Sequence, residues 1–165
     1  MKVEQVSQPS LVAGIRRLLN STVGCRHDTA TPRRERVFGM KFNRQSPLAR
    51  KARRGFRGYP VATVAFYGPD DRRATKVAVG IVAADGAEPS PLERWVSTDS
   101  DVRSDPAIGV EILHFIEARG VKSVVMADRI IGCPHEEGTD YPEGQVCPQC
   151  PFWAHRDRWS GNVLH

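Results

Sequence analysis

The sequence lacks the long hydrophobic run that a transmembrane helix needs. Such helices take about 18–20 consecutive apolar residues, whereas the first apolar stretch, residues 11–19, is interrupted by Arg16 and Arg17. The same stretch lacks the uninterrupted apolar segment of a secretory signal. These absences predict a soluble, cytoplasmic protein with no membrane partner.

The signatures of several large enzyme classes are missing as well. The chain contains no phosphate-binding P-loop, no dinucleotide-binding glycine pattern, no nucleophile elbow and no His-Glu-x-x-His motif. Cysteine is also scarce: the four cysteines are too few for a disulfide-rich secreted scaffold. The sequence therefore gives no support to the enzyme classes that these motifs mark.

What the sequence does contain is sufficient for one folded domain with a small appendage. The chain has 165 residues, of which 40% are hydrophobic and 26% are charged, as is typical of globular proteins. We predict an N-terminal helix and basic irregular arm over residues 1–58 and an α+β core domain over residues 59–132. A zinc-binding tail over residues 133–165 is expected to pack on this core.

Regular hydrophobic patterning begins at residue 59. Two runs of strand-forming residues flank a turn cluster of Gly, Pro and Asp, which predicts a hairpin, and Asp105 followed by Pro106 is a strong helix start. We predict strands over residues 59–67, 75–83, 94–97 and 121–131, the last of them buried, and a helix over residues 106–119. The fold class expected is α+β: a small, twisted, mainly antiparallel sheet with helices on one face, plus a C-terminal zinc knuckle.

Less regular structure is predicted before residue 59. Ser10 can cap a helix in which the apolar residues of segment 11–19 recur with a 3.6-residue period. Residues 21–58 show no sustained period and are predicted to be irregular apart from a short segment over residues 37–42. Loops of this length in a compact domain are usually functional or disordered.

Positive charge is concentrated in the N-terminal third of the chain. Residues 1–60 contain 14 Lys and Arg against 3 Asp and Glu, whereas residues 61–132 contain 8 against 11 and residues 133–165 contain 2 against 5. The formal net charge of +5 is therefore the sum of +11, −3 and −3. Such asymmetry indicates a polyanionic partner.

The basic residues of the arm are mostly arginines, interleaved with phenylalanine, tyrosine, glycine and proline. Guanidinium groups form forked contacts with phosphates, and aromatic rings stack on bases. RNA is favoured over DNA because an irregular arm suits irregular folded RNA better than major-groove readout by a helix. The predicted nucleic-acid contacts are Arg33, Arg34, Arg36, Lys41, Arg44, Arg50, Lys51, Arg53, Arg54 and Arg57. A solvated loop that packs on the acidic remainder of the chain is the alternative.

Three of the four cysteines lie in the tail with metal-ligand spacing. Cys147 and Cys150 form a Cys-x-x-Cys pair, and Cys133 precedes His135 by two residues. Two such pairs can complete a tetrahedral Zn²⁺ site. We predict these four residues as the ligands of a zinc ion, with His155 as the alternative fourth ligand. Phe152 and Trp153 are expected to clamp the tail onto the sheet.

A catalytic zinc site is the main alternative for the tail. His135-Glu136-Glu137 followed by Cys147-Pro-Gln-Cys150 partly resembles the His-x-Glu … Pro-Cys-x-x-Cys signature of zinc-dependent nucleobase deaminases. The resemblance implies that Glu137 is the proton shuttle. It covers 16 residues, and it departs from the signature in having Val146 where a proline is expected and only nine residues between Glu137 and Cys147. Cys133 would also close the site to water, which favours a structural zinc.

These features together predict a non-enzymatic, zinc-containing nucleic-acid-binding protein. The arm would contact phosphates, and affinity would fall about a thousandfold between roughly 50 and 200 mM salt if six side chains do so. A zinc hydrolase or deaminase-like enzyme acting on a nucleobase or nucleic acid is the first alternative. A protein–protein adaptor with a structural zinc, whose arm meets an acidic partner, is the second.

Overall fold

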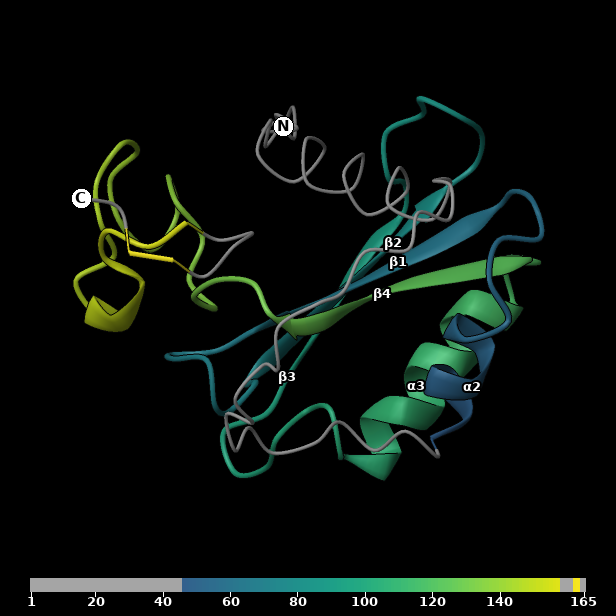
Figure 1. The fold of residues 1–165 in the computed structure, drawn as a ribbon, viewed down its shortest axis with the longest axis horizontal. Coiled ribbons are helices and arrows are strands. Elements are labelled where there is room, and N and C mark those ends of the chain that lie inside the picture. Colours follow the sequence, from purple (N-terminus) through teal and green to yellow (C-terminus); the bar gives the residue numbers. More distant parts are fainter. Residues whose placement is uncertain (1–45, 158–161, 164–165) are drawn as a thin grey trace, which may run out of the picture.

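The computed structural model describes residues 46–157 and 162–163. Within them the chain forms helices, strands and a final 3₁₀ turn (Figure 1): α2 (Pro47–Ala52), β1 (Val61–Tyr67), β2 (Lys76–Val82), β3 (Leu92–Val96), α3 (Pro106–Glu117), β4 (Ser123–Ile130) and η1 (Pro151–Trp153). The predicted helix over residues 10–19, the segment over 37–42 and five predicted nucleic-acid contacts lie outside the described residues. Those contacts are Arg33, Arg34, Arg36, Lys41 and Arg44.

The four described strands form one mixed sheet in the order β3-β2-β1-β4. The predicted hairpin is confirmed: β1 and β2 pair antiparallel, with Val61 opposite Val82 and Tyr67 opposite Lys76. The pair β2–β3 is also antiparallel, but β4 runs parallel to β1. Parallel neighbours need a crossover connection, and α3 supplies it. The chain is therefore α+β, as expected.

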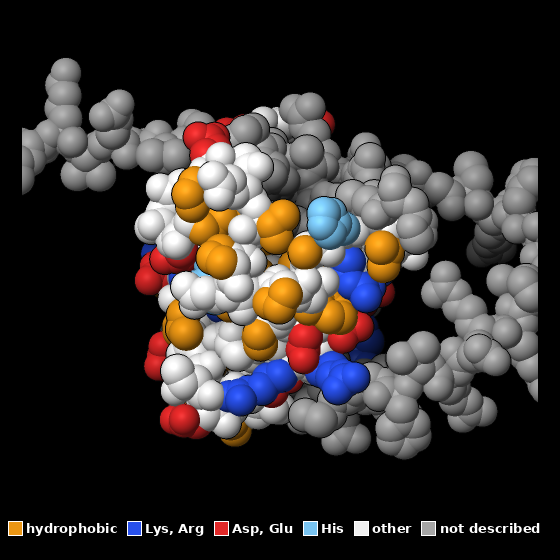
Figure 2. Space-filling model, turned by 90° about the vertical axis from the view of Figure 1, so that its left-hand side faces the viewer, with side chains coloured by type: hydrophobic (Ala, Val, Ile, Leu, Met, Phe, Trp, Pro, Cys, Tyr) orange, Lys and Arg blue, Asp and Glu red, His pale blue; other side chains and the backbone are white. Residues whose placement is uncertain are grey.

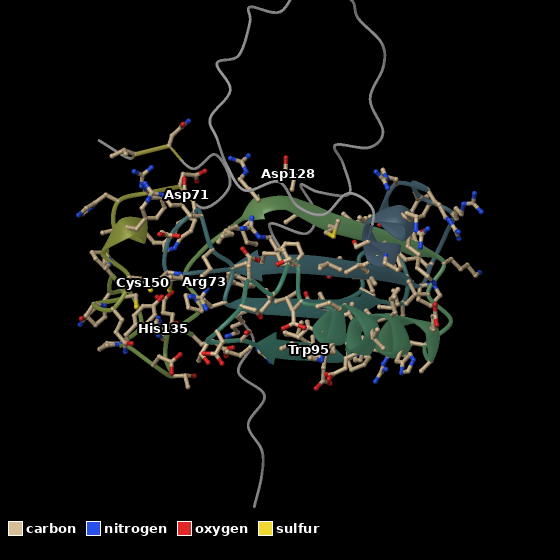
Figure 3. The ribbon with its side chains drawn as sticks, turned by 90° about the horizontal axis from the view of Figure 1, so that it is seen from below. Asp71, Arg73, Trp95, Asp128, His135 and Cys150 are labelled. Atoms are coloured by element: carbon tan, nitrogen blue, oxygen red, sulfur yellow. The ribbon has the colours of Figure 1, made fainter. Side chains whose placement is uncertain are left out.

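The position of β4 at the edge of the sheet corrects one expectation. The β-branched run over residues 121–131 predicts a buried strand, yet the Asp128 side chain is 93% exposed and lies near Arg129. An edge strand has a paired neighbour on one side only, and charged side chains there discourage pairing with another chain. Figure 3 shows Asp128 above β4, directed away from the rest of the sheet.

The main core forms where α3 packs on the sheet. Asp105 caps α3 by accepting hydrogen bonds from the amides of Ala107 and Ile108, as the sequence predicts for this position. The apolar side of α3 meets alternate residues of the strands, and Leu48 of α2 joins the same cluster. The buried members are Leu48, Ala62, Val64, Phe66, Ala74, Val77, Val79, Ile81, Val102, Ile108, Ile112, Phe115, Ile116, Val124 and Ile130.

Helix α2 corrects the expectation of an irregular chain up to residue 58. The Ser46 hydroxyl caps the helix by accepting a hydrogen bond from the amide of Ala49 at 3.1 Å, and Pro47 occupies the first turn. Burial of Leu48 then fixes α2 against α3 and β4. Six residues are too few to show a helical period, so tertiary packing stabilises a helix that the pattern alone does not reveal.

The described residues contain no helix that combines the length and the apolar character needed to cross a membrane.

Candidate metal centre

The structure brings together the four tail residues predicted as ligands. One ligand atom each from Cys133, His135, Cys147 and Cys150 lies within 4.8 Å of the other three. Nδ1 of His135 is 3.5 Å from Sγ of Cys147 and 3.4 Å from Sγ of Cys150. A tetrahedral zinc ion would place a sulfur and a nitrogen ligand about 3.5 Å apart, given Zn–S near 2.3 Å and Zn–N near 2.0 Å. The geometry of this Cys/His cluster therefore fits a single ion.

Local turns aim the ligands at one point. The amide of Cys150 donates to the carbonyl of Cys147 at 3.3 Å, which closes the Cys-x-x-Cys turn, and η1 follows directly, with the amide of Trp153 bonded to the carbonyl of Cys150. The other pair extends from the sheet, because Gly132, which precedes Cys133, accepts a hydrogen bond from the amide of Gly68. One pair is thus held by the sheet and the other by a proline-rich turn.

The segment between the two pairs folds back sharply. The amide of Gly138 donates to the carbonyl of Tyr141, and both Gly138 and Gly144 have positive φ angles, of 80° and 76°, which glycine adopts without strain. A carboxylate oxygen of Glu137 accepts a hydrogen bond from the amide of Gly144 at 2.6 Å. Glu137 is exposed, and this hydrogen bond closes the turn.

Ion pairs attach the tail to the sheet. Lys76 of β2 donates to the carbonyl of Pro134 at 2.8 Å and to the Glu136 carboxylate at 2.6 Å, and Arg94 of β3 reaches the same carboxylate at 2.8 Å. Burial raises the pKa of Glu136, but the hydrogen bond and charge of Lys76, followed by the charge of Arg94, outweigh burial and lower it. Glu136 therefore remains ionised and links His135 to the sheet.

Trp153 provides the apolar part of this attachment. Its ring packs against both the main core and the Cys/His cluster. The indole Nε1 donates to the carbonyl of Gly68 at 2.8 Å, and Phe152 meets the Trp153 ring edge-on with centroids 5.0 Å apart. These contacts agree with the expectation that this aromatic pair clamps the tail onto the sheet.

The three cysteine thiols of the cluster are buried, and none of them forms a disulfide. They belong to Cys133, Cys147 and Cys150, and Cys150 is only 1% exposed. Burial, together with the neighbouring sulfurs of Cys133 and Cys147, raises the pKa of Cys150 to about 12. A bound divalent cation reverses this effect because it stabilises the thiolate. Three thiols crowded next to an imidazole are therefore a donor set suited to a cation that prefers sulfur and nitrogen.

His155, the alternative fourth ligand, lies outside this group. It is exposed and has a φ angle of 57°, two residues after the end of η1. His135 occupies the fourth position instead, because only one residue separates it from Cys133 and the chain turns back at Pro134.

The described part of the basic arm lies at the opposite end of the sheet. β1 begins beside residues 122 and 123, and it ends next to Gly68, which contacts Gly132 and Trp153. The seven residues of this strand separate the two ends by about 20 Å. Figure 3 shows nitrogen-tipped side chains around α2 at the end away from His135 and Cys150. Figure 2 views the cluster end, where apolar side chains are mixed with acidic and basic ones.

The predicted contacts of the arm differ in their surroundings. Arg50, Arg53, Arg54 and Arg57 are exposed, whereas Lys51 is half-buried and forms an ion pair with Glu117 at 3.2 Å. Sequence reasoning missed Arg119 and Lys122, two exposed cations that follow α3. Both lie in a mildly acidic stretch of the sequence rather than in a basic run, so the local sequence does not indicate a binding role for them.

Comparison with family models, with curated proteins and with solved structures finds no match to this chain. Its function is therefore inferred from side chains and their geometry.

Proposed function

We propose that this protein binds nucleic acid, RNA in preference to DNA, and that a structural zinc ion orders its C-terminal tail. The observation that carries the binding proposal is an excess of exposed positive charge at the α2 end. Arg50, Arg54 and Arg57 form no ion pair with a carboxylate of residues 46–157 or 162–163. The sequence adds nine further Lys and Arg over residues 1–45. Unpaired guanidinium groups on one surface are a typical binding site for phosphates.

The zinc proposal rests on the donor set of the Cys/His cluster. Four protein ligands close a tetrahedral site, whereas catalytic zinc sites keep one position for water. Glu137, the residue that an enzyme would use as proton shuttle, is hydrogen-bonded to the amide of Gly144. A structural ion, held about 20 Å from the basic residues, would stabilise the tail and take no direct part in phosphate contacts.

A binding titration tests the nucleic-acid proposal. The full chain is purified at low salt, any co-purifying nucleic acid is sequenced, and affinity for a labelled 20-nucleotide RNA is measured from roughly 50 to 200 mM salt. We expect a steep loss of affinity with salt, and the triple variant Arg50→Gln, Arg54→Gln, Arg57→Gln should bind more weakly with a shallower salt slope. A protein that carries no nucleic acid and binds none at 50 mM salt would refute the proposal.

Metal analysis tests the zinc proposal separately. We expect one zinc ion per chain, and Glu137→Gln should retain both the zinc and the RNA affinity. Loss of a measurable turnover in Glu137→Gln, with the fold intact, would favour an enzyme instead. A chain that retains a protein partner after nuclease treatment, and binds no RNA, would favour an adaptor.

A further inference from the structure

The loop between α2 and β1 holds an exposed aromatic ring among cations. Phe56 is 57% exposed, and it lies two residues from Arg54 and one residue from Arg57, both exposed. Its ring meets Tyr59 nearly edge-on, with centroids 5.5 Å apart and an interplanar angle of 74°. A ring exposed beside two cations can stack on a ligand that carries both aromatic rings and negative charge.

This loop is fixed by a residue far away in the sequence. The hydroxyl of Ser123, at the start of β4, donates to the carbonyl of Gly58 at 2.7 Å and accepts a hydrogen bond from the amide of Arg57 at 2.8 Å. The amide of Lys122 adds a bond to the carbonyl of Pro60 at 2.9 Å. Phe56 is therefore presented by an anchored loop, which lowers the entropy that a ligand must overcome to bind it.

The same contacts bring one further cation to the loop. The side chain of Lys122 lies beside Gly58, since a Cβ on Gly58 would be 3.8 Å from Cδ of Lys122. Within the described residues, Lys122 forms no ion pair with a carboxylate. Arg54, Arg57 and Lys122 thus form, with Phe56, one basic aromatic patch built from two distant segments.

We propose that this patch binds single-stranded nucleic acid, with a base stacked on Phe56 and the flanking phosphates on Arg54, Arg57 and Lys122. The inference rests on the proposed function and specifies its substrate. Single-strand-binding proteins combine a cationic path for the backbone with aromatic rings for unpaired bases. In a duplex the bases are already stacked on one another, so an isolated ring such as Phe56 gains contacts only from an unpaired strand.

We expect the charge of Asp85 to direct the path of the bound nucleic acid. Its carboxylate accepts a hydrogen bond from the Tyr59 hydroxyl at 3.2 Å, which places negative charge beside Tyr59. Phosphates are repelled there and attracted toward Lys122 and the arginines. The backbone is therefore expected to follow the α3–β4 turn, away from the β2–β3 connection.

Fluorescence anisotropy with the full chain tests this inference. The probes are a labelled 12-nucleotide oligo(U) and a labelled 12-base-pair RNA duplex, at the same salt concentration. Phe56→Leu keeps an apolar side chain but removes the ring, and we expect it to weaken oligo(U) binding about fivefold to a hundredfold while duplex binding is unchanged. Lys122→Gln should weaken oligo(U) binding and reduce the salt slope by about one contact.

Arg72→Gln is the matched control. Arg72 is an exposed arginine on the β1–β2 connection, at the other end of the sheet. Its backbone carbonyl accepts a hydrogen bond from Arg103, and a substitution of the Arg72 side chain leaves this bond in place. This variant should bind oligo(U) like the parent chain, and a thermal melt of each variant confirms that it is folded. Equal affinity for both probes, or an unchanged oligo(U) affinity in Phe56→Leu, would overturn this inference alone. Absence of binding to either probe would overturn the proposed function as well.

Discussion

Removal of the proposed zinc ion is predicted to unfold the tail and leave the sheet intact. Residues 133–157 bury few large apolar side chains: besides the three cysteines, only Tyr141 is buried, and Trp153 is partly buried. Burial of one such side chain contributes about 1.5–3 kcal/mol. The main core contains none of the four ligands. The cluster and the core should therefore respond separately to chelation.

The magnitude follows from the ligand set. Zinc contributes about 10–16 kcal/mol to the folding of isolated zinc modules, which exceeds what Tyr141 and Trp153 can supply. Shared among four ligands, this is about 3 kcal/mol each, so Cys150→Ser should weaken metal affinity about a hundredfold. The thiol of Cys150 must lose a proton to bind, and its pKa without metal is raised to about 12. Affinity should therefore fall at least tenfold for each unit by which the pH is lowered below neutrality.

Hydrogen exchange measured by mass spectrometry is the appropriate assay. After a chelator removes the metal, the amides of Gly138, Cys150 and Trp153 should lose their protection, because each bonds to a carbonyl within the tail. Amides of the β1–β2 ladder should keep theirs. Release of the indole from the Gly68 carbonyl should also shift tryptophan fluorescence to the red. The parent chain with added zinc is the control.

Two outcomes would refute this reasoning. The first is a tail that stays protected in a chain shown by mass to contain no metal. The second is a simultaneous loss of protection in the tail and in β1, which would mean that the cluster and the core form one cooperative unit. The first result would show that contacts such as those of Lys76 with Glu136 contribute more than the ion does, and the second would show that such contacts couple the tail to the core.

Three further predictions concern the core domain. Asp101→Asn should lower the free energy of unfolding by about 3 kcal/mol in urea at pH 7, because Arg103 keeps a largely buried charge without its carboxylate. Burial raises the pKa of Asp101, but hydrogen bonds and charge from Arg103 outweigh burial and lower the pKa. The stability that Asp101 contributes is therefore complete above the pKa of the unfolded chain, near 3.9, and is lost as the pH falls through the pKa of the folded protein. A difference in unfolding free energy between parent and variant that stays constant down to pH 2 would contradict this. Gly80→Ala should destabilise the fold by about 2 kcal/mol in a thermal melt, since the added methyl would lie 2.7 Å from Cβ of Pro89. Gly109→Ala, on the open side of α3, should stabilise the fold by about 0.5–1 kcal/mol. Equal effects of the two substitutions on the melting temperature would contradict this, because they would show that the methyl group added at Gly80 is accommodated without loss of stability.

Features that depend on neighbouring residues in the sequence were predictable. The β1–β2 hairpin follows from two strand-forming runs around a turn, and α3 begins at Asp105 because a carboxylate and a proline favour a helix start. The Cys/His cluster was accessible for the same reason, since Cys147 and Cys150 are close in sequence and a short turn brings their sulfurs together. Spacing alone left His135 and His155 as alternatives.

Pairings between distant segments were not predictable. The sequence of Ser123–Ile130 gives no sign that this strand is an edge strand parallel to β1, and so the exposure of Asp128 was missed. Helix α2 depends on the burial of Leu48 against elements far along the chain. A six-residue helix and an edge position both result from tertiary packing, which a local pattern does not encode.

For the function, the amino-acid sequence by itself determined how much positive charge the chain carries and which side chains can ligate a metal. Only the tertiary structure decided where these features lie. The cluster lies at the end of β1 and the cations lie at its beginning, where hydrogen bonds of Ser123 and Lys122 hold the start of β4 against the loop that carries Arg57. The physical reason is that charge and ligand chemistry belong to individual residues. A binding surface, in contrast, requires residues about 65 positions apart to be held side by side, and only the packed sheet does this.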